Sequence, residues 1–233
     1  MFKNIEQYIR CRHIQWQMKK KFGFPNFKCY TRRELWKFQE NGSFSAQYGQ
    51  DWYLATQVFP SKTDGFFIDI GANHPTEINN TLYFEKIGWK GFAFEPQQYF
   101  VDLWKQARTT PCLPYVIGAE KKVVNFNLCE SDVLSSVVEC DPTMKGSMMA
   151  EQVRLDDFLL ERNISSVDFI SIDVEGYEMQ VLQGIDFKKI KIGCIVIENN
   201  RVRRGDDEMR NMIMSNGFNF VARLGCDDIF VHQ

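Results

Sequence analysis

From residue 64 onward, short apolar runs alternate with amphipathic segments, and this alternation restricts the chain to few folds. Repeated βαβ units produce this pattern, so it predicts a parallel sheet with helices on its faces. Each apolar run is hydrophobic enough to be covered on both faces. The predicted strands are residues 66–70, 91–95, 112–118, 168–174 and 192–198, and the predicted helices are residues 77–88, 97–108, 176–187 and 206–216.

The C-terminal end has a different pattern. FNFVARL and DIFVHQ are apolar runs joined by the tight turn Gly225-Cys226-Asp227, which predicts an antiparallel hairpin. Residues 122–130 predict a further strand inserted after the third, and residues 153–163 predict a strand end that runs into a helix. The predicted fold class is α/β, with a doubly wound, mostly parallel, seven-stranded sheet and a C-terminal antiparallel hairpin.

Length and charge indicate one folded domain with a basic extension. The 233 residues are enough for one substantial core and few for two domains of ordinary size. Residues 1–43 carry a net charge of +7, which leaves −9 for residues 44–233 because the whole chain carries −2. We expect a basic N-terminal helical arm over 1–43 and the domain proper over 44–233. The arm is either a solvated helix folded over the domain or a contact for an anionic polymer, a membrane surface or a partner protein.

Targeting signals are not evident in the sequence. It contains no run of about 18 apolar residues and no signal-peptide core, so we expect no transmembrane segment and a cytoplasmic location. None of the seven cysteines forms a C-x-x-C pair, which favours small buried thiols in a reducing compartment.

The segment from residue 66 to residue 96 carries the most chemical information. A buried strand ends in Asp69-Ile70-Gly71-Ala72-Asn73, a helix follows, and a second buried strand ends in Glu95. In open α/β sheets, ligands bind at the carboxyl ends of the strands, and an acid at the end of the second strand can bind both ribose hydroxyls. This segment therefore predicts a nucleoside cofactor site.

The number of glycines narrows the choice of nucleoside. A dinucleotide site needs G-x-G-x-x-G to hold a pyrophosphate at a helix N-terminus, whereas Gly71 stands alone here. A site without a phosphate cradle suits S-adenosyl-L-methionine, which has a ribose and a zwitterionic tail but no phosphate.

The chain resembles FkbM-type methyltransferases, a family of class I methyltransferases with a Rossmann-like sheet. The resemblance runs from about residue 44 to the C-terminus. The segment DFISIDVEGYEMQVLQGI (168–185) is the most specific part of the resemblance. The other matching segments are SAQYGQD (45–51), FIDIGANHP (67–75), NNTLYFEKIGWKGFAFEP (79–96) and LDDFL (155–159).

The resemblance implies an S-adenosylmethionine-dependent O-methyltransferase that acts on a sugar hydroxyl, in a glycan or a glycosylated small molecule. It also implies that Asn80 and Thr81 hold the amino-acid end of the cofactor, with Gln50 nearby. The predicted cofactor-binding residues are Asp69, Gly71, Ala72, Asn73, Asn80, Thr81, Glu95, Pro96, Gly118 and Gln50.

Three acids follow the fourth and fifth predicted strands. Asp173 and Glu175 end the fourth strand and Glu198 ends the fifth, so all three converge on one edge of the sheet. They either bind Mg²⁺ or Mn²⁺, which lowers the pKa of an alcohol, or supply a general base without metal. For Asp173 and Glu175 the alternative is helix capping. His74, beside the cofactor segment, is a third candidate base.

Two other functions remain open at this point. The +7 arm would suit an RNA methyltransferase, although the acidic body and the absence of an N-P-P-Y type motif favour no nucleic-acid partner. A non-catalytic Rossmann-like binding module is favoured if the acids at the strand ends face away from the cofactor.

Overall fold

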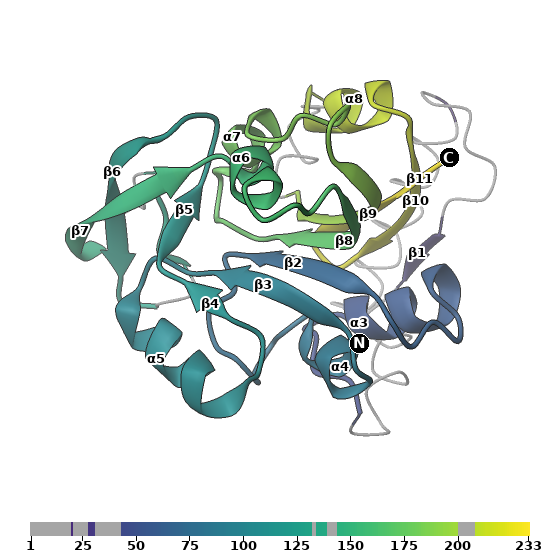
Figure 1. Ribbon diagram of the computed structural model, residues 1–233, viewed down its shortest axis with the longest axis horizontal. Helices are drawn as coiled ribbons and strands as arrows, with labels where there is room; N and C mark the ends of the chain where they lie inside the picture. Colours follow the sequence, from purple (N-terminus) through teal and green to yellow (C-terminus); the bar gives the residue numbers. More distant parts are fainter. Residues whose placement is uncertain (1–19, 21–27, 31–42, 132–133, 139–143, 200–207) are drawn as a thin grey trace, which may run out of the picture.

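A computed structural model describes residues 20, 28–30, 43–131, 134–138, 144–199 and 208–233 (Figure 1). Predictions for the rest of the basic segment 1–43 fall outside these residues. The strands are β1 (Lys28–Tyr30), β2 (Phe66–Ile70), β3 (Lys90–Phe94), β4 (Cys112–Leu113), β5 (Tyr115–Ile117), β6 (Lys122–Cys129), β7 (Met144–Val153), β8 (Ser166–Ile172), β9 (Lys191–Glu198), β10 (Phe218–Leu224) and β11 (Asp227–His232). The helices are α3 (Gln50–Tyr53), the π-helix η1 (Leu54–Val58), α4 (Leu82–Lys86), α5 (Gln98–Ala107), α6 (Leu155–Leu160), α7 (Glu178–Gln183) and α8 (Glu208–Ser215).

The main sheet confirms the predicted fold class. Its strand order is β1-β10-β11-β9-β8-β2-β3-β4, and β11 is antiparallel to both of its neighbours while the other pairs are parallel. The seven strands from β10 to β4 are those that the sequence predicts, and β1 adds an eighth at the edge. The chain runs outward from β2 to β4 and returns to β8, so the winding reverses between β2 and β8, where α/β proteins bind ligands.

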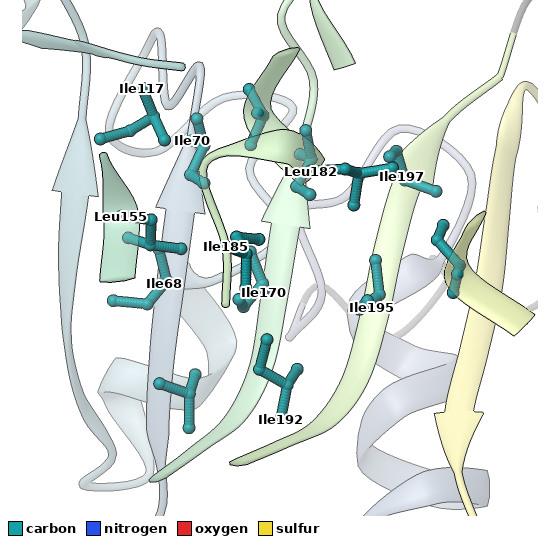
Figure 2. Packing of buried hydrophobic residues seen from close by; sticks show 14 of the residues in the cluster. Ile68, Ile70, Ile117, Leu155, Ile170, Leu182, Ile185, Ile192, Ile195 and Ile197 are labelled. Atoms are coloured by element: carbon teal, nitrogen blue, oxygen red, sulfur yellow. The ribbon is translucent and has the colours of Figure 1, made fainter. Parts of the chain in front are cut away.

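Helices cover both faces of this sheet (Figure 1). Alternate strand residues point to opposite faces. Ile68 and Ile170 therefore face the core cluster that contains the apolar side chains of α6, α7 and α8, as Figure 2 shows for α6 and α7. Phe67 and Phe169 face the other way, into a cluster with side chains of α3, η1 and α4. Each buried side chain of this size stabilises the fold by roughly 1.5–3 kcal/mol.

The prediction of one strand over residues 112–118 is wrong. Residues 112–113 form β4 in the main sheet, whereas residues 115–117 form β5 in a separate three-stranded sheet of order β5-β7-β6. Pro114 lies at the break, where its missing N–H cannot continue the ladder. The inserted strand predicted over 122–130 is confirmed as β6, and it pairs with β7 in this smaller sheet. The sequence predicts only the last residue of β7.

The predicted helix over residues 77–88 is shorter than expected. It begins at Leu82, because the side chain of Asn79 accepts the backbone N–H groups of Thr81 and Leu82 at 3.0 and 2.8 Å. Such side-chain bonds compete with helix formation. The residues before Leu82 are thereby kept as a loop beside the carboxyl ends of β2 and β3.

Two further findings concern membrane-spanning helices and cysteines. Among the described residues, no helix is both long enough and apolar enough to span a membrane. Cys129 is disulfide-bonded, which contradicts the expectation of reduced cysteines at this position. Disulfides persist mainly in oxidising compartments, so this bond gives no support to the expected cytoplasmic location.

Candidate functional site

The site begins at the turn that follows β2. Gly71 has a φ of +77°, which favours glycine, and a Cβ built there would lie 1.7 Å from the carbonyl oxygen of Asp173. The N–H groups of Gly71 and Ala72 donate to Phe94 O at 3.0 and 3.1 Å. The backbones that leave β2, β3 and β8 therefore meet at one point.

A cavity of about 600 Å³ opens above these strand ends. Its volume lies within the roughly 300–1,000 Å³ of typical ligand pockets. The predicted site residues in its lining are Asp69, Gly71, Ala72, Asn73, His74, Asn80, Glu95, Pro96, Asp173, Glu175 and Glu198. The predicted site residues that are not in its lining are Gln50, Thr81 and Gly118.

Those last three residues contact side chains around the cavity and do not line it. Thr81 donates a hydrogen bond to Asp69 Oδ2 at 2.8 Å, and Gln50 donates one to Asp227 Oδ2 at 2.5 Å. Gly118 packs against Gln152, whose side chain would lie 2.5 Å from an added Cβ.

Glu95 presents a carboxylate at the end of β3. The side chain is buried, and its two oxygens accept the backbone N–H groups of Asn73 and Gln97 at 3.1 and 2.9 Å. Burial raises the pKa of Glu95 to about 7, against the lowering effect of these hydrogen bonds. Glu95 is thus fixed in place with spare acceptor capacity toward the cavity, as a ribose diol requires.

The three predicted acids lie close together on the other side of β2 from Glu95, at the ends of β8 and β9. One ligand oxygen from each of Asp173, Glu175 and Glu198 lies within 4.8 Å of the other two. Asp173 faces the open cavity but is otherwise closely surrounded by protein, which raises its pKa well above the ordinary value, and Glu198 adds to this shift. Burial and Glu178 likewise raise the pKa of Glu175 to about 7.

The contacts around α7 weigh against the capping alternative. α7 begins without a side-chain cap, and Glu178 accepts the N–H of Gly176 at 2.9 Å. Glu175 has a φ of +51°, a strained conformation of the kind that clusters at functional sites. The backbone therefore holds Glu175 toward the other acids and not over a helix end.

Comparison with known proteins decides the family. A family model described as the methyltransferase FkbM domain matches residues 69–220. The chain belongs to the FkbM methyltransferase family. The structure is similar to that of methyltransferase FkbM from Methylobacillus flagellatus KT, with a TM-score of 0.51 and 14% sequence identity over 81% of this chain. The chain spans about half of that protein, 48% of its length. A search of curated protein sequences finds no significant match.

In this FkbM methyltransferase, the contacts of His74 favour a structural role over that of a base. Its Nδ1 lies 3.1 Å from the backbone N–H of Glu77 and 3.3 Å from that of Thr76, and accepts both. The neutral ring then carries its proton on Nε2 and has no free acceptor for a substrate proton.

Arg108, which the sequence analysis does not single out, lies behind the part of the cavity lined by Asp69. Its fully buried guanidinium donates to Glu85 at 2.8 Å, to Asn79 Oδ1 at 3.2 Å and to Thr81 Oγ1 at 3.3 Å. Asn79 and Thr81 in turn donate to Asp69, whose pKa burial raises. In the sequence Arg108 is a single basic residue at the end of a predicted helix. No local pattern indicates that its side chain contacts the loop at residues 75–81.

An Arg108→Met variant is expected to lose about 2–3 kcal/mol of unfolding free energy, because several buried acceptors lose their donor. The loss stays below that of a fully buried ion pair because Glu85 keeps its hydrogen bonds from Thr109 and Thr110. Urea denaturation measures the change. Arg162→Met is the matched control, since that guanidinium stacks on Phe158 but is 40% exposed. If both variants lost the same unfolding free energy, the buried hydrogen bonds of Arg108 would not be what stabilises the fold.

Proposed function

We propose that the chain is an S-adenosylmethionine-dependent O-methyltransferase that acts on a sugar hydroxyl. Glu95 carries the proposal, because a buried, backbone-anchored carboxylate at the end of β3 faces a cavity at the point where the winding of the sheet reverses. This arrangement suits the ribose of a nucleoside cofactor.

The residues present fit this cofactor better than a dinucleotide. The turn after β2 offers Gly71, whose missing Cβ leaves room only for the Asp173 carbonyl, and no second glycine follows to form a phosphate cradle. Asn80 donates to Ser171 at 2.9 Å, and both line the cavity near the sheet centre, where the amino-acid end would lie. When bound, the cofactor supplies a methyl group that is attached to a positively charged sulfur. The acidic residues that line the cavity favour binding of this positive charge.

The acids supply the remaining requirement, removal of the acceptor's proton. Asp173 faces the cavity and is closely surrounded by protein, so its carboxylate binds a proton more readily than one in water does. Alternatively, Asp173, Glu175 and Glu198 would hold Mg²⁺ or Mn²⁺ through hard oxygen ligands, and the metal would lower the pKa of the hydroxyl. In the first version Asp173 contacts the reacting hydroxyl, and in the second it would contact the metal.

Calorimetric titration with S-adenosylmethionine, and separately with NAD, tests the cofactor. We expect micromolar binding of the first and none of the second. Glu95→Gln is expected to weaken binding about 30-fold. The substitution removes the negative charge and replaces one acceptor oxygen with an amide NH2 group, which only donates hydrogen bonds. Glu161→Gln, an exposed acid outside the cavity lining, is the control. No binding of S-adenosylmethionine to the unmodified protein would overturn the proposal. The same titration with Mg²⁺ and Mn²⁺ tests the metal site.

Cofactor affinity is expected to rise about tenfold between pH 6 and pH 8, because only ionised Glu95 accepts both ribose hydroxyls and its pKa is about 7. Folding stability changes in the opposite direction. The raised pKa means that the folded protein holds this proton more tightly than the unfolded chain, so the contribution of Glu95 is lost as the pH rises from about 4.5 through 7. Titrations at several pH values check the affinity, and the slope should disappear in Glu95→Gln.

A further inference from the structure

Two segments outside the residues that the family model matches form one wall of the cavity. The match covers residues 69–220, whereas this wall comes from residues 45–51 and from the turn between β10 and β11. We call it the 48/225 wall. Its members are Gln47, Tyr48, Arg223, Gly225 and Cys226.

The 48/225 wall is built by specific contacts between its two segments. A Cβ placed on Gly225 would lie 2.2 Å from the ring of Tyr48, so the ring packs directly against the glycine. Gln50 joins the same segments, since its side chain accepts the N–H of Tyr48 at 2.8 Å and donates to Asp227 at 2.5 Å. The wall is therefore a folded part of the site, and the ring of Tyr48 has a fixed position in it.

The wall lies at the end of the cavity opposite Glu95. Glu95 follows β3, and four strand steps separate β3 from β11, or about 19 Å at the usual strand spacing. Asp173 and Glu198 lie between these ends, and Glu198 pairs with Asp227 at the start of β11. A cofactor whose ribose binds Glu95 would place its methyl group near Asp173, so the wall lies beyond the methyl group.

The charges around the cavity limit what binds against this wall. The acidic residues that line it are Asp69, Glu77, Glu95, Asp173, Glu175 and Glu198. Arg223 is the one arginine or lysine among the lining residues that the structure describes, and it donates to Asp228 at 2.6 Å and to Asn199 O at 2.9 Å. Once these acids are ionised, a carboxylate or phosphate would meet repulsion here, whereas hydroxyl groups find acceptors.

We propose that the 48/225 wall is the acceptor subsite and that it takes an uncharged polyhydroxylated ring. The ring of Tyr48 packs on the C–H face of the acceptor, and the carboxylates accept hydrogen bonds from its hydroxyl groups. Acceptors with an anionic group next to the reacting hydroxyl are excluded. This inference rests on the proposed function, because the wall lies beyond the methyl group only if the nucleoside binds at Glu95.

Saturation-transfer NMR on the complex with S-adenosylhomocysteine tests the subsite. The probes are the methyl glycosides of glucose, galactose, mannose and rhamnose, each measured in EDTA and in Mg²⁺, with methyl glucuronide as the anionic counterpart. We expect at least one neutral glycoside to bind. In EDTA we expect methyl glucuronide to bind at least about tenfold more weakly than methyl glucoside.

Two glycines give a matched pair of variants. Gly225→Ala would push the added Cβ into the ring of Tyr48, whereas at Gly88 the nearest atom to an added Cβ is 3.6 Å away. Both glycines have positive φ, +62° and +101°, so both variants carry the same kind of backbone strain. We expect Gly225→Ala to weaken glycoside binding about tenfold or more and to change the affinity for S-adenosylhomocysteine less than about threefold, while Gly88→Ala keeps both. Tyr48→Leu, which adds no strain, should weaken glycoside binding similarly, and Tyr48→Phe should retain it.

The outcomes are distinct. Unchanged glycoside binding in both Gly225→Ala and Tyr48→Leu would overturn the assignment of the wall. Equal binding of glucoside and glucuronide in EDTA would overturn the claim that the subsite takes only uncharged rings. Binding of no glycoside in either condition would overturn the claim that it takes a polyhydroxylated ring. Failure of the unmodified protein to bind S-adenosylhomocysteine would instead overturn the proposed function.

Discussion

Asp173→Asn is expected to lower the rate of methyl transfer by about 10²–10⁴-fold, the usual contribution of a general base. The amide cannot take the proton of the acceptor hydroxyl, and it is a poor ligand for Mg²⁺ compared with a carboxylate. The side chain faces the cavity with the other two acids, so the substitution changes the chemistry of the site without changing its shape. Release of S-adenosylhomocysteine with a methyl glycoside acceptor measures the rate.

Calorimetry on the same variant separates the two roles of Asp173. If it acts as a base, the variant loses the rate but keeps its cation binding nearly unchanged. If it is a metal ligand, Mg²⁺ or Mn²⁺ binding disappears together with the rate. Asp157→Asn, an exposed acid on α6, is the control and should leave the rate unchanged. A rate within about threefold of the unmodified protein would contradict both roles.

Asp228→Asn is expected to lower the unfolding free energy by about 3–5 kcal/mol, because it removes the charge that two buried guanidinium groups share. Asp228 is fully buried and accepts from Arg210 at 2.8 and 2.9 Å and from Arg223 at 2.6 Å. Asn199 also donates to it, at 2.7 Å. A domain of this size is stabilised by about 5–15 kcal/mol, so the variant should unfold at a markedly lower temperature.

Thermal denaturation followed by circular dichroism measures this loss. Asp102→Asn is the control, because its partner Lys105 is 2.9 Å away on the surface of α5 and water screens that pair. We expect no measurable change in the control. Since Arg223 lines the cavity, the Asp228 variant should also bind methyl glycosides less well at temperatures where it remains folded. Equal melting temperatures for both variants would show that the buried network contributes little.

Local sequence patterns predict most of the fold, and most of the predicted site residues line the cavity. Continuous apolar strands, the single Gly71 and the acids at the strand ends are features that neighbouring residues reveal by themselves. β7 is missed because its hydrophobicity does not follow the alternation of its burial. The less exposed positions hold Gly146, Met148, Ala150 and Gln152, which give no apolar period of two.

The supporting contacts of the site are missed for another reason. Gln50 is a predicted site residue, but its partner Asp227 lies 177 positions away, and Arg108 is 29 positions from Asn79. Such pairs carry no periodic signal, because only the folded sheet brings the residues together. Their importance lies in burial and in shared hydrogen bonds, which a single sequence does not display.

The contact between Gly71 and the carbonyl of Asp173 has a mechanical consequence. The two loops touch backbone to backbone with no side chain between them, so neither can be displaced without the other. The spacing between the ends of β3 and β8, which carry Glu95 and Asp173, is therefore set by the backbone of the sheet and not by adjustable side chains. In contrast, the proposed acceptor subsite at the 48/225 wall rests on one aromatic ring and one turn, so substitutions there can change the cavity without moving these two backbones.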